Sequence, residues 1–385
     1  MENSKQHNIL SIGSKLFNRD YIIDQFISEG GMNSQIYKVH MCNYPDKQYA
    51  AKIIFKPDKC DENFWQKFRQ EEITSLRILN KPNLVQTYET FNFKNEQYDV
   101  KVFIMDYVDG ISLKKLLSTQ GALTPKLALN LFLKILNGIK TLHNFHYCII
   151  HRDLKPENIM LDKNFTNVTI LDFGISSVIE ITKQSLKQQQ IMHITDEVEL
   201  YGTPPYIIPD ALLLQTNKNN KITVQYDFFS LGIILYEMIM GSRPFNDQNI
   251  FKDSKGHYQS KIIKLPLTYD MLNISNNPTI PICLENLIFR CIACKPHDKK
   301  FRFNNVEEII EAARKCLMVI NGQEKDESLI KPTYERIYQQ TPTFNIEKEY
   351  KNQPIKKQWW FFFIVISFFG ALLVVIILLS IAKII

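Results

Sequence analysis

Three side chains with complementary chemistry lie within one short stretch of the chain, from His151 to Asn158. Asp153 carries a carboxylate that can accept a proton, Lys155 an ammonium that can neutralise phosphate charge, and Asn158 an amide oxygen that can bind a metal ion. Transfer of a phosphoryl group depends on positioning and charge stabilisation, so it needs such groups close together. One short loop can aim all three into one cleft. The stretch therefore predicts phosphoryl transfer.

Two further motifs stand on either side of this stretch. Asp172-Phe173-Gly174 follows it, and Lys52 precedes it within an apolar run, where an unpaired ammonium would be costly. Together the motifs resemble the signature of a eukaryotic-type (Hanks-type) protein kinase, and most of all that of bacterial membrane-anchored Ser/Thr kinases. The resemblance covers about residues 21–322. It implies an α+β, two-lobed protein kinase fold, with a small β-rich N-lobe that holds one main helix and a larger helical C-lobe.

The resemblance also implies an activity and its catalytic residues. The expected reaction transfers the γ-phosphoryl group of ATP to Ser or Thr hydroxyls of protein substrates, with autophosphorylation and a signalling role. Asp153 and Lys155 would be the catalytic residues. Asn158 and Asp172 would bind Mg²⁺, with Mn²⁺ as an alternative.

Lys52 would contact the nucleotide phosphates and pair with a Glu on the N-lobe helix. Phe68, Leu76 and Leu79 fall at helical spacing from Glu72, which places Glu72 on the inward stripe and rotates Glu71 away from it. We choose Glu72 as the partner, with Glu71 as the fallback.

The other nucleotide contacts are assigned by resemblance. Tyr49–Ile54 resembles the third strand of the N-lobe, and Val102–Gly110 resembles the hinge, whose backbone groups bind adenine. The Gly-rich turn departs from the family pattern. Alignment on Ile36 places Glu29, Gly31 and Ser34 at the glycine positions, whereas alignment on Ser28–Met32 puts Gly30 second. The implied ATP contacts are Ile27, Gly30, Gly31, Ile36, Ala50, Lys52, Glu72, Met105 (the gatekeeper), Asp106 and Val108.

Ile175–Pro209 is the expected activation loop. In the family, the Arg before the catalytic Asp binds a phosphorylated loop residue, which makes Arg152 and Thr195 the regulatory pair, although acidic neighbours of Thr195 would repel a phosphate. Thr203 together with Lys155 indicates Ser/Thr rather than Tyr specificity. The run from Gly202 resembles the family's peptide-binding platform, but Asp210 replaces the usual Glu, and Arg302 is its expected partner.

Local patterns predict the elements that must position these residues. Thr124-Pro125 is a capping residue followed by proline, and it opens an apolar helical face that leads to the catalytic stretch. A second helix begins at Tyr226 and stops at Gly241. Its Asp227 is expected to accept backbone N–H groups of the catalytic stretch or to cap the helix, and both roles can hold at once. Asn305 with Glu308 starts a last helix, which runs to about Gly322.

Composition sets broad limits. The chain has 385 residues, of which 45% are hydrophobic and 22% charged, as in globular proteins. The net charge is +6 without a basic tract, so we expect no nucleic-acid partner. The seven scattered Cys fit reduced thiols. Cys291, Cys294 and His297 stand near one another, but no second pair at finger-like spacing accompanies them, which disfavours a zinc site.

The C-terminal part changes composition twice. Residues 323–358 are polar and contain three prolines, as in a linker. Residues 359–382 are almost wholly apolar and would span roughly 36 Å as a helix, enough to cross a bilayer. Lys356 and Lys357 precede this segment, so the positive-inside rule places the kinase domain in the cytoplasm and the C-terminus outside. We therefore expect a single-pass protein of the cell membrane, with dimerisation left open.

The expected domain boundaries are an N-terminal tail at 1–20, a kinase domain at 21–322 that divides near residue 108, a linker at 323–358 and a transmembrane helix at 359–382. The first twenty residues lack an apolar segment, so no signal peptide is expected. The sequence disfavours two other functions. A pseudokinase scaffold would lack one of Lys52, Asp153, Asn158 or Asp172, and all are present. The platform-like run from Gly202 disfavours a kinase of small molecules.

Overall fold

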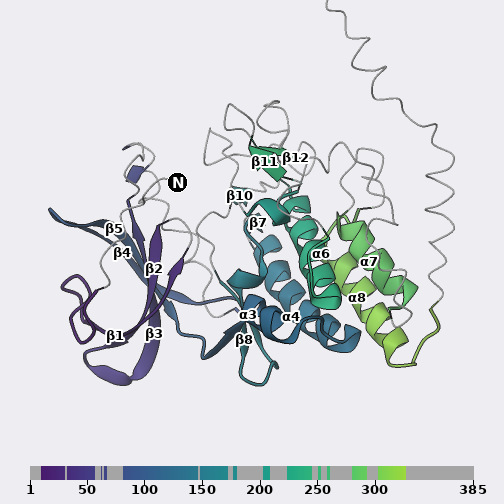
Figure 1. Ribbon diagram of the computed structural model, residues 1–385, viewed down its shortest axis with the longest axis horizontal. Helices are drawn as coiled ribbons and strands as arrows, with labels where there is room; N and C mark the ends of the chain where they lie inside the picture. Colours follow the sequence, from purple (N-terminus) through teal and green to yellow (C-terminus); the bar gives the residue numbers. More distant parts are fainter. Residues whose placement is uncertain are drawn as a thin grey trace, which may run out of the picture. The chain divides into compact units, whose positions relative to one another are not determined.

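The computed structural model describes most of residues 10–326 and divides the chain into two compact units, residues 1–328 and 329–385 (Figure 1). All described residues belong to the first unit. They are 10–30, 33–56, 62, 65–66, 81–145, 148–171, 177–179, 203–208, 223–244, 250–252, 258–260, 280–292 and 302–326.

The N-lobe is built on a sheet of five strands, counted among the described residues, in the order β1-β2-β3-β5-β4. All neighbouring pairs are antiparallel. The strands are β1 (Tyr21–Gly30), β2 (Ser34–Met41), β3 (Tyr44–Phe55), β4 (Thr87–Lys94) and β5 (Asp99–Asp106). The central strand β3 carries Lys52. The order of the sheet thus places this residue between β2 and β5, with a neighbour on either side.

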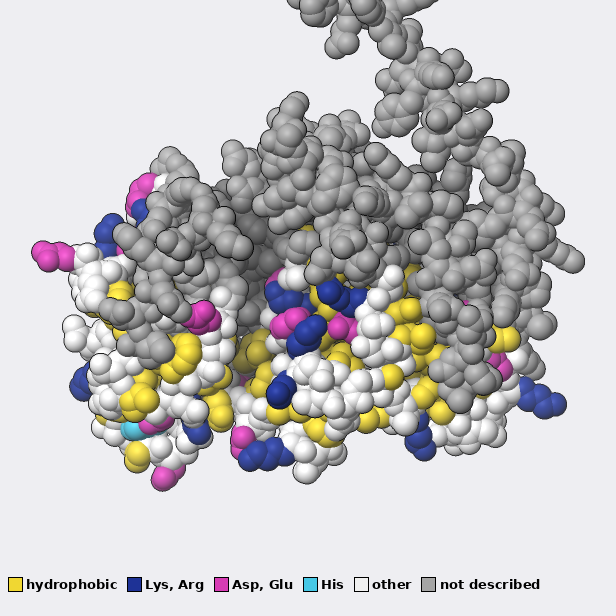
Figure 2. Space-filling view, viewed as in Figure 1, with side chains coloured by type: hydrophobic (Ala, Val, Ile, Leu, Met, Phe, Trp, Pro, Cys, Tyr) yellow, Lys and Arg dark blue, Asp and Glu magenta, His cyan; other side chains and the backbone are white. Residues whose placement is uncertain are grey.

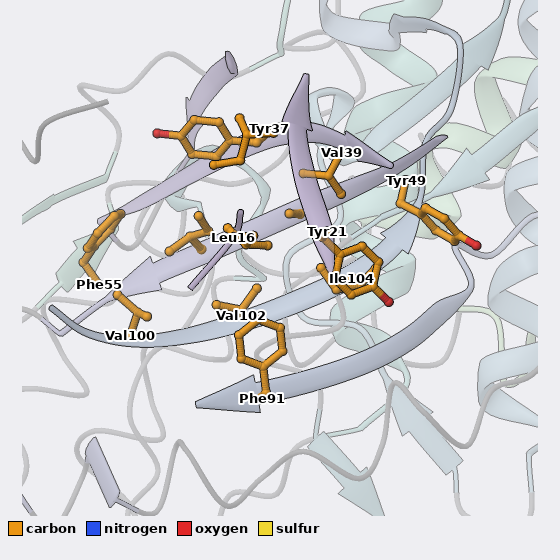
Figure 3. Packing of buried hydrophobic residues seen from close by; sticks show 13 residues of the cluster. Leu16, Tyr21, Tyr37, Val39, Tyr49, Phe55, Phe91, Val100, Val102 and Ile104 are labelled. Carbon is orange, nitrogen blue, oxygen red and sulfur yellow. The ribbon is translucent and has the colours of Figure 1, made fainter. Parts of the chain in front are cut away.

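One face of this sheet packs into a hydrophobic core. Because side chains alternate along a strand, every second residue of β3 contributes, namely Tyr49, Ala51, Ile53 and Phe55. Figure 3 shows these rings and aliphatic chains pointing into the same space as those of the neighbouring strands. Ala50 and Lys52 alternate with the core residues and therefore project from the other face.

Residues 10–20 pack against the sheet. Leu16 is fully buried in the core, and Figure 3 shows it in the midst of the cluster. Phe17 stacks on Phe93 with ring centroids 4.7 Å apart. Burial of a leucine side chain stabilises a fold by about 1.5–3 kcal/mol. The segment expected from the sequence to be a tail outside the domain therefore includes a core residue of the N-lobe.

The C-lobe is mainly helical. Its described helices are α3 (Leu113–Gln120), α4 (Pro125–His143), α6 (Gln225–Met240), α7 (Ile282–Ile292) and α8 (Val306–Ile320). Figure 1 shows α4, α6, α7 and α8 gathered side by side. Short strands and 3-10 turns lie between them: β6 (Gly110–Ser112), β7 (Cys148–Ile150), η1 (Pro156–Asn158), β8 (Ile159–Asp162), β9 (Val168–Ile170), β10 (Ser177–Ile179), η2 (Pro204–Tyr206), β11 (Ile250–Lys252) and β12 (Tyr258–Ser260).

The expected helix boundaries are confirmed. Thr124 caps α4 by accepting a hydrogen bond from the backbone N–H of Leu127, and Pro125 is the first helical residue. Helix α6 is buried on almost all sides and ends at Gly241, whose φ of 73° lies in the left-handed region that favours glycine. Asn305 caps α8 through the N–H of Glu308.

A close contact joins the residues before β4 to the C-lobe. The backbone N–H of Ile170 in β9 donates to the carbonyl of Asn83, and the N–H of Val85 donates to the carbonyl of Ile170, both over 2.9 Å. The side chain of Asn83 also donates to the carbonyl of Val168. Gly138 in α4 makes room for this contact, because a Cβ there would lie 2.7 Å from Ile170 Cδ1 and 3.0 Å from the carbonyl oxygen of Asn83.

A membrane-spanning helix was expected at residues 359–382, which lie outside the described part of the chain. Within the described part, no helix combines the length and apolar character needed to span a bilayer.

Candidate active site

The catalytic stretch leaves β7 in an unusual backbone conformation. Arg152 has a φ of 69°, which is uncommon for a residue with a side chain. The bend lets two successive N–H groups reach one carboxylate: the N–H of His151 donates to Asp227 Oδ2 and that of Arg152 to Asp227 Oδ1, each over 2.9 Å. The expected role of Asp227 as acceptor for this stretch is confirmed. The capping alternative is not, because Val224 occupies the capping position of α6.

Asp227 is completely buried and also contacts His143 at the end of α4, with 2.8 Å between His143 Nε2 and Asp227 Oδ2. Burial alone would raise the pKa of the Asp227 carboxyl. The hydrogen bond and electrostatic attraction of His143, together with the N–H of Arg152, outweigh burial, so the pKa lies below its ordinary value. A buried carboxylate thus holds the end of α4 and the catalytic stretch together.

His151 is fixed through both ring nitrogens. Its Nδ1 accepts a hydrogen bond from the N–H of Asp153 over 3.3 Å, and its Nε2 lies 2.9 Å from the carbonyl oxygen of Leu171. A backbone N–H can only donate, so Nδ1 must be the bare nitrogen and Nε2 must carry the proton. These two hydrogen bonds orient the imidazole ring, and the one from Asp153 also holds the backbone of Asp153 in place.

Three donors converge on the carboxylate of Asp153. Lys155 Nζ donates to Oδ2 over 2.7 Å, and Thr203 Oγ1 donates to Oδ1 over 2.8 Å. Asn158 Nδ2 contacts both Oδ2, at 3.1 Å, and the backbone carbonyl of Asp153, at 2.9 Å. Lys155 Nζ also donates to Thr203 Oγ1 over 2.8 Å, which closes a ring of hydrogen bonds. The structure therefore brings together three residues predicted from one short stretch and a fourth from the expected activation loop.

The three donors fix the orientation of the Asp153 carboxylate and leave it able to accept a proton. A carboxylate offers about four acceptor positions, and the side chains of Lys155, Thr203 and Asn158 use three of them. The remaining position can accept a hydroxyl proton. The side chain of Asp153 is 14% exposed, so it is held mostly away from water yet reachable.

Asn158 keeps its amide oxygen for another partner. Within the described part of the chain, both of its side-chain hydrogen bonds use Nδ2, and its backbone carbonyl accepts from the N–H of Leu171 over 2.8 Å. Leu171 is the last described residue before Asp172, whose role as a metal ligand stays a prediction. An amide oxygen and a carboxylate are the hard oxygen ligands that Mg²⁺ prefers, so the donor set fits such an ion.

The predicted nucleotide contacts of the sheet share one face. Lys52 pairs with Ile36 on β2 and with Phe103 on β5, and Ala50 pairs with Met105. Residues directly opposite each other in a sheet project from the same side. The side chains of Ile36, Ala50, Lys52 and Met105 therefore line the face opposite the hydrophobic core.

The turn between β1 and β2 is a close hairpin. Gly30 pairs with Ser34, and a Cβ on Gly30 would lie 2.4 Å from Ser34 Oγ, so a side chain there would displace the serine. Asn33 adopts a left-handed φ of 55°. Ile27 lies at a β-bulge between two paired positions and is 42% exposed. Gly31 lies outside the described residues, so both alignments of the Gly-rich turn stay predictions.

The hinge is attached to β4 through Asp106. Tyr88 donates its hydroxyl to Asp106 Oδ1 over 2.6 Å, which raises the pKa of Tyr88 to about 12, with burial adding to the effect. The N–H of Gln86 donates to Asp106 Oδ2, and the N–H of Asp106 donates back to the carbonyl of Gln86. Val108 follows in the loop after β5 and is half-buried.

The segment after Thr203 is held by α6. Tyr206 donates its hydroxyl to Glu237 Oε2 over 2.6 Å, and Ser230 donates to the carbonyl of Tyr206 over 2.7 Å. Burial and the Glu237 carboxylate together raise the pKa of Tyr206. Lys114 on α3 lies within 3.8 Å of Glu157 and 3.7 Å of Glu237. Figure 2 shows basic and acidic side chains gathered side by side near the centre of its view.

Several predicted residues lie outside the described part of the chain. They are Gly31, Glu71, Glu72, Asp172, Thr195, Asp210, Cys294 and His297. Their roles, and the pairing of Arg302 with Asp210, stay predictions. Within the described part, no three His, Cys, Asp or Glu side chains group into a metal site.

Three residues that shape the site were not predicted from the sequence. His143 holds Asp227, Tyr88 holds the hinge residue Asp106, and Glu237 holds the platform residue Tyr206. His143 falls four residues after Ile139 on the apolar face of the predicted helix, and a polar residue within that face was the available signal. Tyr88 and Glu237 carried none, because their partners are 18 and 31 residues away in sequence.

Comparison with known proteins agrees with this geometry. Residues 21–310 match the family described as protein kinase domain. A protein of Mycoplasma genitalium, named as a candidate serine/threonine-protein kinase, is 35% identical over 353 residues, which cover 86% of this chain and 86% of the relative. Its counterpart in Mycoplasma pneumoniae is 33% identical over 352 residues, with 85% and 86% covered.

A third relative is longer than this chain. Serine/threonine-protein kinase PrkC of Bacillus subtilis is 28% identical over 302 residues, which cover 78% of this chain and 41% of PrkC. The matched region contains the catalytic stretch, its partner Asp227 and the nucleotide face of the sheet. The family match and the two Mycoplasma relatives, 33% and 35% identical to this chain, lead to the same conclusion. The chain belongs to the protein kinase family and is a serine/threonine protein kinase.

Proposed function

We propose that this kinase phosphorylates proteins with Mg-ATP, phosphorylates itself, and acts in signalling at the cytoplasmic face of a membrane. The observation that carries the catalytic part of the proposal is the convergence of Lys155, Thr203 and Asn158 on the carboxylate of Asp153. Such an arrangement has no evident structural purpose at a partly exposed site, whereas phosphoryl transfer depends on it.

In the proposed mechanism, Asp153 accepts or steers the proton of the substrate hydroxyl at its remaining acceptor position. Lys155 holds a positive charge where negative charge develops on the transferred group. Its Nζ lies 2.7 Å from Asp153 Oδ2 and 2.8 Å from Thr203 Oγ1. The hydroxyl of Thr203 links the two side chains, because it accepts a hydrogen bond from Lys155 and donates one to Asp153. The three residues act as one unit.

The metal would be held by the amide oxygen of Asn158 and the carboxylate of Asp172, and the donor set favours Mg²⁺, with Mn²⁺ as an alternative. When bound, the ion neutralises charge on the β- and γ-phosphates. Lys52 would contact the phosphates and pair with Glu72, while Ile36, Ala50 and Met105 would contact the base from the same face of the sheet. Asp106 and Val108 would offer backbone groups to adenine.

The location rests on sequence. The apolar run 359–382 would anchor the protein as a single-pass helix, with the kinase domain in the cytoplasm, the C-terminus outside and residues 323–358 as the linker. Thr195 is the proposed phosphosite that would bind Arg152 and activate the enzyme. Dimerisation on the membrane would favour phosphorylation of one copy by another.

The test is a labelling experiment with the full-length protein, purified in detergent and incubated with labelled ATP and Mg²⁺. The parent protein should incorporate label on Ser and Thr, and the Asp153→Asn and Lys52→Met variants should not. Mass spectrometry then identifies the phosphosites.

Two results would contradict the proposal, and they differ. An unlabelled parent protein that still binds nucleotide would mark a pseudokinase, because binding without transfer leaves only a scaffolding role. Equal label in the parent protein and both variants would mean that a contaminating kinase performed the reaction. A parallel incubation with Mn²⁺ in place of Mg²⁺ shows which ion the site uses.

A further inference from the structure

One lysine stands between two carboxylates beside the catalytic stretch. Lys114, in the first turn of α3, has its Nζ 3.8 Å from Glu157 Oε1 and 3.7 Å from Glu237 Oε1. Glu157 belongs to the catalytic stretch and Glu237 to α6. Among the described residues, no other basic side chain forms an ion pair with either carboxylate. Three elements that are far apart in sequence therefore meet at one ammonium group.

Glu237 is the buried member of this group. Its side chain is 6% exposed, and its Oε2 accepts the hydroxyl of Tyr206 over 2.6 Å, while Oε1 is the atom nearest to Lys114. A buried carboxylate is unfavourable unless a charge compensates it. Lys114 provides that compensation, so removal of its ammonium would leave a buried negative charge that favours another cation.

Lys114 is held loosely between the two carboxylates. Both of its distances exceed the usual limit of about 3.2 Å for an N–H···O hydrogen bond, so the attraction is electrostatic. The side chains of Lys114 and Glu157 are 44% and 45% exposed. A lysine carries a point charge on a flexible stem. Its place between the carboxylates is therefore open to solvent and can be reached by another molecule.

These charges lie close to where a substrate must bind. Glu157 follows Asp153 by four residues, so their Cα atoms are at most about 14 Å apart. On the other side, Tyr206 follows Thr203, the donor to Asp153, by three residues. An extended substrate spans about 3.3–3.6 Å per residue. Residues within about four positions of the accepting Ser or Thr can therefore reach the three charged side chains.

We propose that Lys114 determines which substrates the kinase selects, because it fills the place between Glu157 and Glu237 that a basic side chain of the substrate would otherwise take. The inference rests on the proposed phosphorylation of proteins. With Lys114 in place, an Arg near the accepting hydroxyl gives little advantage. Without it, the planar fork of a substrate Arg can donate to both carboxylates, which a single ammonium at these distances does not.

The experiment compares two series of peptides built on a phosphosite that the labelling experiment identifies. One series carries a single Arg at each of the four positions on either side of the accepting residue, and the other carries Gln at the same positions. The full-length protein, purified in detergent, is assayed for kcat/KM with each peptide. Lys114→Met should raise the ratio of Arg to Gln peptides about tenfold at one or two positions, the equivalent of about 1.4 kcal/mol.

Three further variants separate this role from general effects of charge. Lys115→Met removes a charge from an exposed position of the same helix and should leave the ratio as in the parent protein. Lys114→Arg keeps a cation between the carboxylates and should also keep the parent ratio. Glu157→Gln, added to Lys114→Met, should reduce the gained preference, because one of the two carboxylates is then lost.

Two outcomes would overturn the proposal. The first is an unchanged ratio in Lys114→Met while the Gln peptides are still phosphorylated, since Lys114 would then only support the fold. The second is a strong preference for Arg in the parent protein, since the carboxylates would then accept a substrate cation with Lys114 in place. Phosphorylation of the Gln peptides by the parent protein tests the proposed function by itself, whereas the role of Lys114 is tested by the ratio between the two series.

Discussion

Asp153 shows how much a single residue depends on others far along the chain. Lys155 and Asn158 come from its own loop, whereas Thr203 is 50 residues away and supplies the hydrogen bond to Oδ1. Hydrogen bonds to charged groups each contribute about 1.5–3 kcal/mol. Three of them on one carboxylate restrict its orientation to the one in which its last acceptor position is open, and each should affect the rate of transfer.

Replacement of Thr203, the donor farthest from Asp153 in sequence, by Val tests how much one of these hydrogen bonds contributes to the rate. The variant keeps the shape of the side chain but removes the hydroxyl that links Lys155 to Asp153. We expect kcat to fall about ten- to a hundredfold, the equivalent of one hydrogen bond to a charged group. The KM for ATP should be unchanged, because Thr203 is not part of the nucleotide face of the sheet. Steady-state kinetics with a peptide substrate measure both constants.

Thr203→Ser is the matched control. It retains the hydroxyl and loses only a methyl group, so its kcat should stay close to that of the parent protein. If Val and Ser behave alike, the hydroxyl has no part in catalysis, and the ring of hydrogen bonds around Asp153 is only structural.

Asp227 leads to a prediction about acid stability. Its pKa is lower in the folded protein than the ordinary value of 3.8, so the unfolded chain binds more protons in acid than the folded one. The stabilisation from this carboxylate is therefore complete above pH of about 4 and is lost as the pH falls below that value. Asp227→Asn should lower the free energy of unfolding by about 3 kcal/mol at pH 7, because two backbone donors and His143 lose a charged acceptor.

Urea unfolding of the parent protein and Asp227→Asn between pH 7 and pH 3 measures this effect. The difference between the two free energies should be constant at the higher pH values and shrink below about pH 4. Asp46→Asn, at an exposed position, serves as the control for general charge effects. A difference that stays the same down to pH 3 would mean that the pKa of Asp227 is not lowered by folding.

At the scale of elements, the contact between α4, β9 and the residues before β4 positions the catalytic stretch. Helix α4 ends at His143, which binds Asp227, and β9 ends beside Leu171, which binds both His151 and Asn158. Gly138 lets α4 approach Asn83 and Ile170 closely. The approach of these backbones determines where the two ends of the catalytic stretch are held.

Gly138→Ala should therefore destabilise the protein although alanine favours helices. The new Cβ would lie 2.7 Å from Ile170 Cδ1, so the end of that side chain must move, and 3.0 Å from the Asn83 carbonyl oxygen, a tight contact with backbone that has little room to shift. Overpacking costs about 1–3 kcal/mol, which exceeds the gain of up to about 1 kcal/mol in helix propensity. Urea unfolding should show the net loss, together with a lower kcat. Asn137→Ala, on the exposed side of the same helix, should be neutral or stabilising. A stable Gly138→Ala variant would refute the tight contact.

The elements with a strong local signal were predictable from the sequence. Thr124-Pro125, Gly241 and Asn305 with Glu308 mark helix ends through their own backbone requirements, and all are confirmed. Strand β4 was not predicted, because only Thr87 and Phe91 in it are buried and its alternation of polar and apolar residues is weak. Leu16 was missed because the apolar residues around it, Leu10, Ile12 and Phe17, fit neither the period of a strand nor that of a helix.

The site divides in the same way. The types and spacing of Asp153, Lys155 and Asn158 were enough to predict that they act together, because one loop carries them. The hydrogen bond from Thr203 and the hold of His143 on Asp227 depend on tertiary placement across 50 and 84 residues. The residues next to each of these positions in the sequence carry no information about contacts across such separations.

At the scale of the whole molecule, the chain joins a kinase domain to two segments of contrasting composition. Residues 323–358 are polar and residues 359–382 are almost wholly apolar, and the proposed linker and membrane tether rest on this contrast. A tethered kinase would meet mainly substrates at the membrane surface.

The tether can be tested by placing charges in the apolar run. Leu372→Arg with Val375→Arg puts two cations near the middle of residues 359–382, each at a cost of about 2.5–3.5 kcal/mol for insertion. The parent protein should stay in the membrane fraction after extraction with alkaline carbonate, and the double variant should move to the soluble fraction. Gln339→Arg with Gln340→Arg adds the same charge to the linker and should leave the protein in the membrane.

Orientation needs a separate measurement, because membrane binding alone does not tell which side carries the enzyme. Protease added outside intact cells should leave the kinase domain uncut, since Lys356 and Lys357 favour the cytoplasm for the residues before the apolar run. Cleavage of the domain in intact cells would reverse the proposed topology and remove its access to cytoplasmic ATP. A parent protein that carbonate releases would instead exclude the tether, while the catalytic proposal, which rests on Asp153 and its three donors, would stand.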